Sequence, residues 1–199
     1  MAVVHQTTMV PTKLELLTQW LPKQDWYAGG PAGPHLARAG GFRLDDPAGE
    51  VGIEFMAVRD DAAREATAYH VPMTYRGAAL AGADAALIGT AEHGVLGRRW
   101  IYDGPADPVL LAALTELIRG RAQAQAQSQS DTPDATVHVE PAPGAPAEPF
   151  GISFARLLAA PDAEPPSGPP SGVAQVTALW TAPDGALIRS VFAAAKIRP

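Results

Sequence analysis

Apolar residues recur at every second position between Phe42 and about Thr90, and this spacing constrains the fold more than any other feature. The clearest runs are 51–56 and 66–75. Because successive side chains of a strand point to opposite faces of a sheet, the spacing predicts half-buried β-strands. The polar segment 59–62 lies between the two runs and has turn composition, so we expect a β-hairpin.

Pro72 lies inside the second run and has no N–H group to donate to a neighbouring strand. The sequence therefore predicts that this strand is at an edge of the sheet or carries a bulge at Pro72. Two shorter apolar stretches, 85–89 and 95–102, indicate one or two further strands.

Two helices are predicted from their end signals. Thr12 and Glu15 have the spacing of a capping box, in which a hydroxyl and a carboxylate bond to free amides of the first turn. Leucines then recur at helical spacing until Pro22, which ends the run. The second helix begins at Asp107, an N-cap residue followed by proline, and ends before Gly120.

Glycine and proline together make up 39 of the 199 residues, about a fifth, against a usual background of about 12%. Much of the excess lies in two tracts. Residues 121–149 are rich in alanine, glutamine and proline, the composition of a linker that cannot bury enough surface to order itself. Residues 161–172 are a proline-rich loop. We expect both tracts to be disordered insertions.

The last strands are predicted to form a hairpin over residues 173–195. Two strand-like runs flank the turn 182–185, where a proline presets one φ angle and a glycine permits a positive one. The chain then divides into the first part of an α+β core at 1–120, the linker at 121–149 and C-terminal strands at 150–199. The predicted class is α+β, an antiparallel sheet with the helices on one face.

The net charge is −6, from 15 lysines and arginines against 21 aspartates and glutamates. Nucleic acids and anionic membranes bind clustered basic residues, so neither is expected as a partner. The first twenty residues lack the cationic start and apolar run of a signal peptide, and no run of 18 apolar residues occurs. These features predict a cytoplasmic protein.

No cofactor, metal ion or catalytic residue is predicted. The chain has no cysteine, which excludes thiolate-ligated zinc and iron–sulfur sites. Its five histidines lack the spacing of paired metal ligands. The glycine-rich stretch 28–33 lacks the lysine of a phosphate-binding loop, and no G-x-S-x-G motif marks a nucleophilic serine.

The densest group of reactive side chains lies in segment 92–100. An acid, an imidazole, two guanidiniums and an indole could together hold a sugar or a phosphate. The alternative, which is commoner for surface charges, is a loop salt bridge beside a core tryptophan. The residues are Glu92, His93, Arg98, Arg99 and Trp100.

Trp26 and Tyr27 are a second candidate group. The two rings could stack on a sugar, whereas aromatic pairs at a helix-to-strand junction usually fill a core. Together with the five residues of segment 92–100 they are the candidate surface for interaction or sugar contact.

The segment 14–29, LELLTQWLPKQDWYAG, resembles the opening of the N-terminal cap of actinobacterial maltokinases, including those fused to trehalose synthase. In that cap a helix ends in a motif similar to W-L-P-x-Q-R-W-F-A-G-K-G. The chain departs from it at Asp25, where arginine is usual, and at Gly30-Pro31, where lysine-glycine is usual. Later segments follow the order of that cap's strands and helix, so the resemblance spans roughly 12–120: His70–Gly77, Leu87–Thr90, Tyr102–Asp103 and the Asp107 helix.

The resemblance implies a cystatin-like cap, a curved antiparallel sheet with helices on one side. In the full kinases the cap precedes a lobe with an HGDxHxGQ-like catalytic loop and a second, metal-binding aspartate. Neither motif occurs in this sequence. Because phosphoryl transfer needs a nucleotide cradle, metal ligands and a base together, the chain alone is not expected to be a kinase.

The function expected from the resemblance is that of a stand-alone, non-catalytic cap-like module in α-glucan, glycogen, maltose or trehalose metabolism. Its expected partner is a kinase or a glycan enzyme. The alternative is a protein that binds an α-glucan or maltose-type ligand, or an enzyme of sugar-kinase or branching type that acts only with a separate catalytic chain. A third interpretation is a former kinase domain without an interaction.

Overall fold

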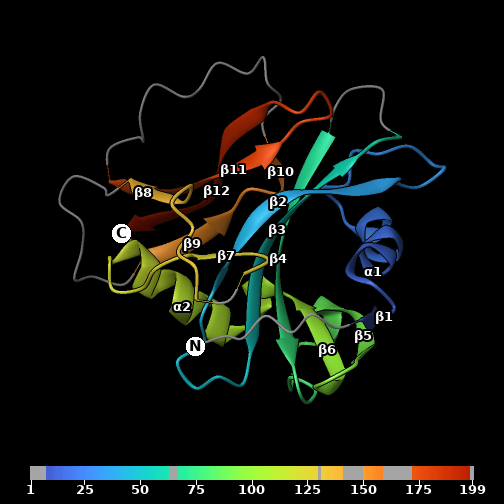
Figure 1. Ribbon diagram of the computed structural model, residues 1–199, viewed down its shortest axis with the longest axis horizontal. Helices are drawn as coiled ribbons and strands as arrows, with labels where there is room; N and C mark the ends of the chain where they lie inside the picture. The colour runs from blue at the N-terminus through green and yellow to red at the C-terminus, as the bar shows by residue number, and fades with distance from the viewer. Residues whose placement is uncertain (1–7, 63–66, 130, 141–149, 159–171, 198–199) are drawn as a thin grey trace.

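The structure is a computed structural model that describes residues 8–62, 67–129, 131–140, 150–158 and 172–197 (Figure 1). Its helical elements are α1 (Lys13–Trp20), η1 (Leu21–Lys23), η2 (Asp84–Ala86), η3 (Gly104–Ala106) and α2 (Pro108–Ile118). Its strands are β1 (Met9–Val10), β2 (Leu36–Leu44), β3 (Gly52–Asp60), β4 (Thr67–Arg76), β5 (Leu87–His93), β6 (Gly97–Asp103), β7 (Gln125–Ala126), β8 (His138–Glu140), β9 (Phe150–Phe154), β10 (Leu157–Leu158), β11 (Val173–Thr181) and β12 (Leu187–Ile197).

The strands pair antiparallel in one sheet with the order β1-β5-β6-β4-β3-β2-β11-β12-β9. Three short strands lie off this path, with β10 on β4, β7 on β2 and β8 on β11. The predicted hairpins are confirmed, since β3 pairs with β4 along its whole length and β11 pairs with β12. Together with the two short helices this is the α+β class that the sequence predicts.

Both predicted helix starts are confirmed. The Thr12 hydroxyl accepts from the Glu15 amide, and the Glu15 carboxylate accepts from the Thr12 amide at 2.7 Å, which completes the capping box. The Asp107 carboxylate accepts from the Val109 amide at 2.9 Å at the start of α2. Pro22 ends α1, but the chain continues through η1, where a proline in the first turn removes no hydrogen bond.

Strands β3 and β4 are buried on both faces, although their alternation predicts half-buried strands. On one face Phe55 shares a core with Leu114 of α2 and Trp180 of β11. On the other face Met56 shares a core with Leu17 of α1. Because neighbouring residues of a strand point to opposite faces, α1 and α2 cover opposite faces of the sheet. The expectation of helices on one face therefore differs from the structure.

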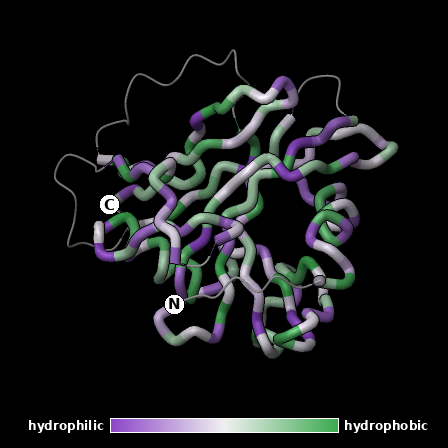
Figure 2. The backbone as a smooth tube through the Cα atoms, viewed as in Figure 1, coloured by the Kyte–Doolittle hydropathy of each residue, from purple (hydrophilic) through white to green (hydrophobic). Residues whose placement is uncertain are grey.

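Helix α2 lies against the concave side of the sheet (Figure 1). Its core cluster includes side chains from β2, β3, β4, β11 and β12. Phe42 stacks on Phe55 with ring centres 4.5 Å apart, and Phe192 lies 5.9 Å from Phe42. Hydrophobic stretches run along the central strands, while hydrophilic ones gather in peripheral turns (Figure 2). The sheet thus curves around α2 to bury an apolar helix.

Residues 121–140 differ from the predicted linker, because they contain two short strands, β7 and β8, that pair with the sheet. β7 pairs with Phe42 and Arg43 of β2, next to Gly40, where β2 pairs with β11. β8 pairs with residues 175–177 of β11, and Ala124 is buried in the core around α2. Backbone amides form these ladders whatever the side chains, so composition alone does not reveal them. The predicted disorder at 141–149 and 161–171 lies outside the described residues.

Strand β4 is neither an edge strand nor bulged at Pro72. It pairs with β3 on one side without a register shift. On its other side β10 pairs with residues 68–69 and β6 with residues 73–76, which leaves Pro72 between them. The His70 amide donates to Arg156 on this side, so the nitrogen of Pro72, two residues along, faces the same way. Its missing N–H therefore interrupts neither ladder.

Two adjacent glycines in β2 allow a close approach of its neighbours. Gly40 and Gly41 have φ angles of +138° and +122°, next to a bulge in the pairing of β2 with β3. A Cβ on Gly40 would lie 3.2 Å from the carbonyl oxygen of Leu179 on β11. A Cβ on Gly41 would lie only 2.0 Å from the carbonyl oxygen of Phe55. Neither position accepts another residue without movement of the backbone.

We expect Gly41→Ala to lower the free energy of unfolding by about 2–4 kcal/mol, because it combines a disfavoured φ with a backbone clash. Urea denaturation followed by tryptophan fluorescence measures this change. The matched control is Gly30→Ala, since a Cβ there meets nothing within 4 Å and φ is not positive. Equal midpoints for the two variants would contradict the role of Gly41.

Candidate functional site

The predicted segment 92–100 forms the hairpin of β5 and β6, and three of its side chains share one face. Glu92 pairs with Arg98 across the hairpin, and Trp100 lies two residues further along on the same face. A Glu92 carboxylate oxygen is 3.9 Å from Arg98 Nε, and the Arg98 guanidinium lies 5.6 Å from the Trp100 ring centre. Val10 of β1 pairs with Glu92 and joins this face. These four residues are termed the hairpin face.

His93 and Arg99 do not belong to the hairpin face. Their side chains bond to the backbone of the turn between β5 and β6. His93 Nδ1 accepts from the Leu96 amide at 3.1 Å. Arg99 Nη2 donates to the Leu96 carbonyl oxygen at 2.7 Å. The structure therefore brings Glu92, Arg98 and Trp100 together and places the other two candidates at the turn.

Trp26 and Tyr27 are half-buried in an aromatic cluster beside α1. The Trp26 ring centre lies 5.8 Å from that of Trp20 and 6.0 Å from that of Tyr69. Tyr27 stacks on Tyr69 at 5.7 Å, and the Arg156 guanidinium lies 4.9 Å from the Trp26 ring centre. Both rings pack against other side chains of the fold, as in the core-filling alternative left open by the sequence.

The two candidate groups lie at opposite ends of β4. Tyr69, which contacts Trp26 and Tyr27, pairs with β3 near the start of the strand. Trp100 pairs with Arg76 at its end. Arg76 lies seven residue steps along the strand from Tyr69, a span of about 23 Å. The seven candidate residues therefore do not form a single site.

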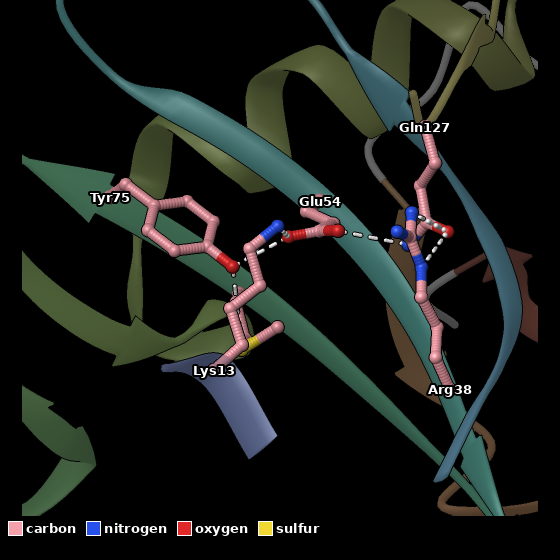
Figure 3. Close-up of polar contacts among 6 residues, drawn as sticks. Lys13, Arg38, Glu54, Tyr75 and Gln127 are labelled. Carbon is pink, nitrogen blue, oxygen red and sulfur yellow. Dashed lines mark hydrogen bonds and ion pairs between the residues drawn. The ribbon is translucent and has the colours of Figure 1, made fainter. Parts of the chain in front are cut away.

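A polar cluster that the sequence analysis missed surrounds Glu54 in the middle of β3 (Figure 3). Glu54 is 2% exposed. Its Oε2 accepts from Lys13 Nζ at 2.6 Å and from the Tyr75 hydroxyl at 2.5 Å, and its Oε1 accepts from Gln127 Nε2 at 2.9 Å. Arg38 donates to Oε1 of Gln127 from Nε at 3.2 Å and from Nη2 at 2.7 Å. These five residues are termed the Glu54 cluster.

The Glu54 cluster joins five segments of the chain. Lys13 is the first residue of α1, Arg38 lies on β2, Tyr75 on β4 and Gln127 just after β7. The Lys13 ammonium also lies 5.3 Å from the centre of the Tyr75 ring. A Cβ at position 41 would come within 3.0 Å of Gln127 Nε2, so a glycine there gives Gln127 room to reach across β2.

The surroundings of Glu54 favour the charged carboxylate. Burial raises the pKa of Glu54, but the Lys13 ammonium and the hydrogen bonds from Lys13 and Tyr75 lower it, and the net direction is below the ordinary value. Burial and the neighbouring carboxylate raise the pKa of Tyr75 well above its ordinary value, so the phenol keeps its proton and donates it. The carboxylate therefore stays ionised and its donors come from the chain itself.

Only a weak sequence signal points to the Glu54 cluster. Glu54 is a charged residue on the strand face that carries Met56 and Val58, where apolar residues are expected. Its hydrogen-bond partners lie 41, 21 and 73 residues away along the chain. No local motif joins residues at such separations, so spacing could not identify them.

Two bidentate ion pairs hold the ends of the sheet to other elements. Arg76 of β4 donates to Asp107, the N-cap of α2, at 2.6 and 2.7 Å. Burial raises the pKa of Asp107, but the Arg76 hydrogen bonds lower it, with a net direction below the ordinary value. Arg156 donates to Asp103 at the end of β6 at 2.9 and 2.5 Å. These pairs position helices and strands, and each guanidinium is matched by a carboxylate.

We expect Glu54→Gln to cost about 3–5 kcal/mol of unfolding free energy, because one amide oxygen cannot serve three donors and Lys13 loses its counter-ion. Chemical denaturation measures the loss. Glu116→Gln is the matched control, because Glu116 pairs with Arg121 at the surface, and a change there should cost less than about 1 kcal/mol. A loss no larger than that of the control would contradict the structural role of Glu54.

Within the described ranges, no group of three or more histidine, aspartate or glutamate side chains is arranged to hold a metal ion. In the same part of the chain, no helix is both long enough and apolar enough to cross a membrane.

The family whose model matches the chain is the maltokinase N-terminal cap domain, over residues 20–107. This match covers 88 of the 199 residues, from the last residue of α1 to the N-cap of α2. It includes Glu54, Trp26 and most of the hairpin face. No curated protein and no solved structure matches the chain. Residues 20–107 are thus similar to the maltokinase N-terminal cap domain, which confirms over this range the resemblance found in the sequence.

Proposed function

We propose that this chain is a non-catalytic cap module that serves a catalytic partner in α-glucan, maltose or trehalose metabolism. The observation that carries the proposal is the match of residues 20–107 to the maltokinase cap family. It is supported by the sequence, which contains no HGDxHxGQ-like catalytic loop. It is also supported by the buried acids Glu54 and Asp107, which are bonded to lysine and arginine side chains of the fold.

The partner would bind the end of the sheet formed by β1 and the β5–β6 hairpin. Large apolar side chains are exposed there, with Val10 at 65%, Val95 at 62% and Leu96 at 45% exposure. Arg98 and Trp100 lie on the same hairpin, and arginine and tryptophan are residue types that often dominate the binding energy of protein interfaces. Helix α1 packs on the opposite face of the hairpin, which leaves the hairpin face turned away from it.

We expect the double change Val95→Asp with Leu96→Asp to weaken partner binding at least tenfold, because it places two charges in an apolar contact. The purified chain is used to capture its partner from the native cell. The partner is identified by mass spectrometry, and its affinity is then measured with purified components.

Leu187→Asp is the matched control for this experiment. Leu187 is 66% exposed but lies on β12, away from the β5–β6 hairpin. The control should bind as the unchanged chain does. The proposal would be abandoned if no enzyme of maltose, trehalose or α-glucan metabolism were recovered, or if the control lost binding equally.

A second candidate function is sugar binding at the hairpin face, favoured by the meeting of Glu92, Arg98 and Trp100 on one surface. An indole can stack on a pyranose ring while a carboxylate and a guanidinium bond to its hydroxyls. Glu92 and Arg98 have side chains 68% and 61% exposed, so their long ion pair can open at little cost.

Titration with maltose, maltose 1-phosphate or glycogen, followed by tryptophan fluorescence, tests sugar binding. We expect a saturable change in the unchanged chain and its loss in Trp100→Leu. Absence of a saturable change up to millimolar sugar would eliminate this candidate and leave the protein partner as the proposed ligand.

A further inference from the structure

His70 is a buried imidazole of β4 that belongs neither to the Glu54 cluster nor to the hairpin face. It has no exposed surface. Its ring centre lies 5.9 Å from that of Phe55 on β3 and 4.5 Å from that of Phe192 on β12. Nδ1 is 2.9 Å from the carbonyl oxygen of Ala155, whereas Nε2 has no hydrogen-bond partner. A carbonyl oxygen only accepts, so Nδ1 carries a proton, and burial with no partner for Nε2 favours the neutral ring.

The ring lies beneath a seam where segment 150–158 crosses between two strands. Residues 150–154 of this segment pair with β12, and residues 157–158 pair with β4. Between them the Ala155 amide donates to the Phe192 carbonyl oxygen at 3.0 Å, and the His70 amide donates to the Arg156 carbonyl oxygen at 2.9 Å. The ring and the backbone amide of His70 thus bond to Ala155 and Arg156, where the segment passes from β12 to β4.

The backbone groups of Ala155 and Phe192 favour a positive charge on the ring, but burial outweighs them. Burial lowers the pKa of His70 to about 3, and the nearby Arg156 guanidinium, itself bonded to Asp103, adds to the lowering. Charged side chains on the strands packed against the ring are bonded elsewhere or exposed: Glu54 with Lys13, Arg59 with Asp61, Asp60 with the His35 amide, Arg76 with Asp107, Arg189 with the Thr136 carbonyl oxygen, and Lys196 at the surface.

We propose that His70 is an acid-sensitive latch, whose protonation releases segment 150–158 from β4 while β3 and β4 stay paired. A proton on Nε2 would be a buried donor with no acceptor in hydrogen-bond geometry, held among aromatic rings. Moving the segment lets water reach the ring and breaks its short ladders with β4 and β12, the Arg156–Asp103 ion pair and the burial of Leu158. Opening the β3–β4 hairpin would break a much longer ladder, so the local opening costs less.

The direction of the pH effect follows from the lowered pKa. In the closed state the ring is neutral, whereas in the open state it binds a proton. The free energy that favours the closed state is therefore fully present above the ordinary histidine pKa of about 6.5. It decreases as the pH falls from 6.5 toward 3. At pH 5 the open state gains about 30-fold in population relative to pH 7.5.

Hydrogen exchange of the unchanged full chain, read by mass spectrometry and corrected for the intrinsic exchange rate, tests this proposal. Between pH 7.5 and pH 5 the protection of peptides covering 150–158 should fall about 30-fold, and at both pH values it should stay below the protection of peptides covering 52–60. A constant protection of 150–158 would overturn the proposal, and so would equal protection of the two sets of peptides, since that is global unfolding.

His70→Asn removes the titrating group and keeps an amide that can donate to Ala155. Its protection at 150–158 should change less than about threefold over the same pH range. His138→Asn is the control, because His138 is an exposed histidine of β8, and it should retain the 30-fold fall. A fall in His70→Asn equal to that of the unchanged chain would overturn the assignment to His70. If His70→Asn does not fold, the two peptide sets of the unchanged chain still decide the outcome.

Discussion

A buried carboxylate in the middle of β3 determines where several other segments of the chain must lie. Glu54 accepts three hydrogen bonds, from the start of α1, the end of β4 and the segment after β7. An ionised carboxylate without these donors would cost several kcal/mol to bury. The burial of Glu54 therefore needs these donors, and each donor fixes the position of the helix, strand or segment that carries it. Lys13 holds α1 to its face of the sheet, and Gln127 holds the segment around β7 to the edge of β2.

Burial of β3 on both faces has a second consequence for the fold. α1 covers the face of Glu54 and Met56, and the opposite face needs α2 together with the C-terminal strands. Trp180 and Phe192 of those strands lie in the same core as Phe55. The core around α2 is therefore shared between residues 20–107, which match the cap family, and residues that follow them. The Trp180 indole donates to Ser190 at 2.9 Å inside this core, so its one polar group is satisfied without water.

The features that the sequence predicted correctly depend on residues close together in the chain, whereas the features that it missed depend on residues far apart. The capping box at Thr12, the N-cap at Asp107 and the turn before β12 each depend on residues within a few positions of one another. The grouping of Glu92 with Arg98 is also local, since a tight turn joins β5 to β6. The linker residues that pair with β2 and the placing of the helices depend instead on contacts between distant segments. For the same reason the Glu54 cluster could not be predicted, because its members meet only after the sheet has formed.

Glu54 and His70 show two opposite solutions to burying a titratable group in the same sheet. Both lie on central strands, one on each face, and both are nearly inaccessible to water. Glu54 is surrounded by an ammonium, a phenol and an amide, so the charged form is the stable one. His70 is surrounded by two phenylalanine rings and one carbonyl oxygen, so the neutral form is the stable one. Glu54 accepts hydrogen bonds from three side chains, whereas the ring of His70 makes one hydrogen bond, from Nδ1, and its Nε2 has no partner in hydrogen-bond geometry. The face that holds α1 is thus fixed by a satisfied charge, while the seam closed by segment 150–158 depends on a charge being absent.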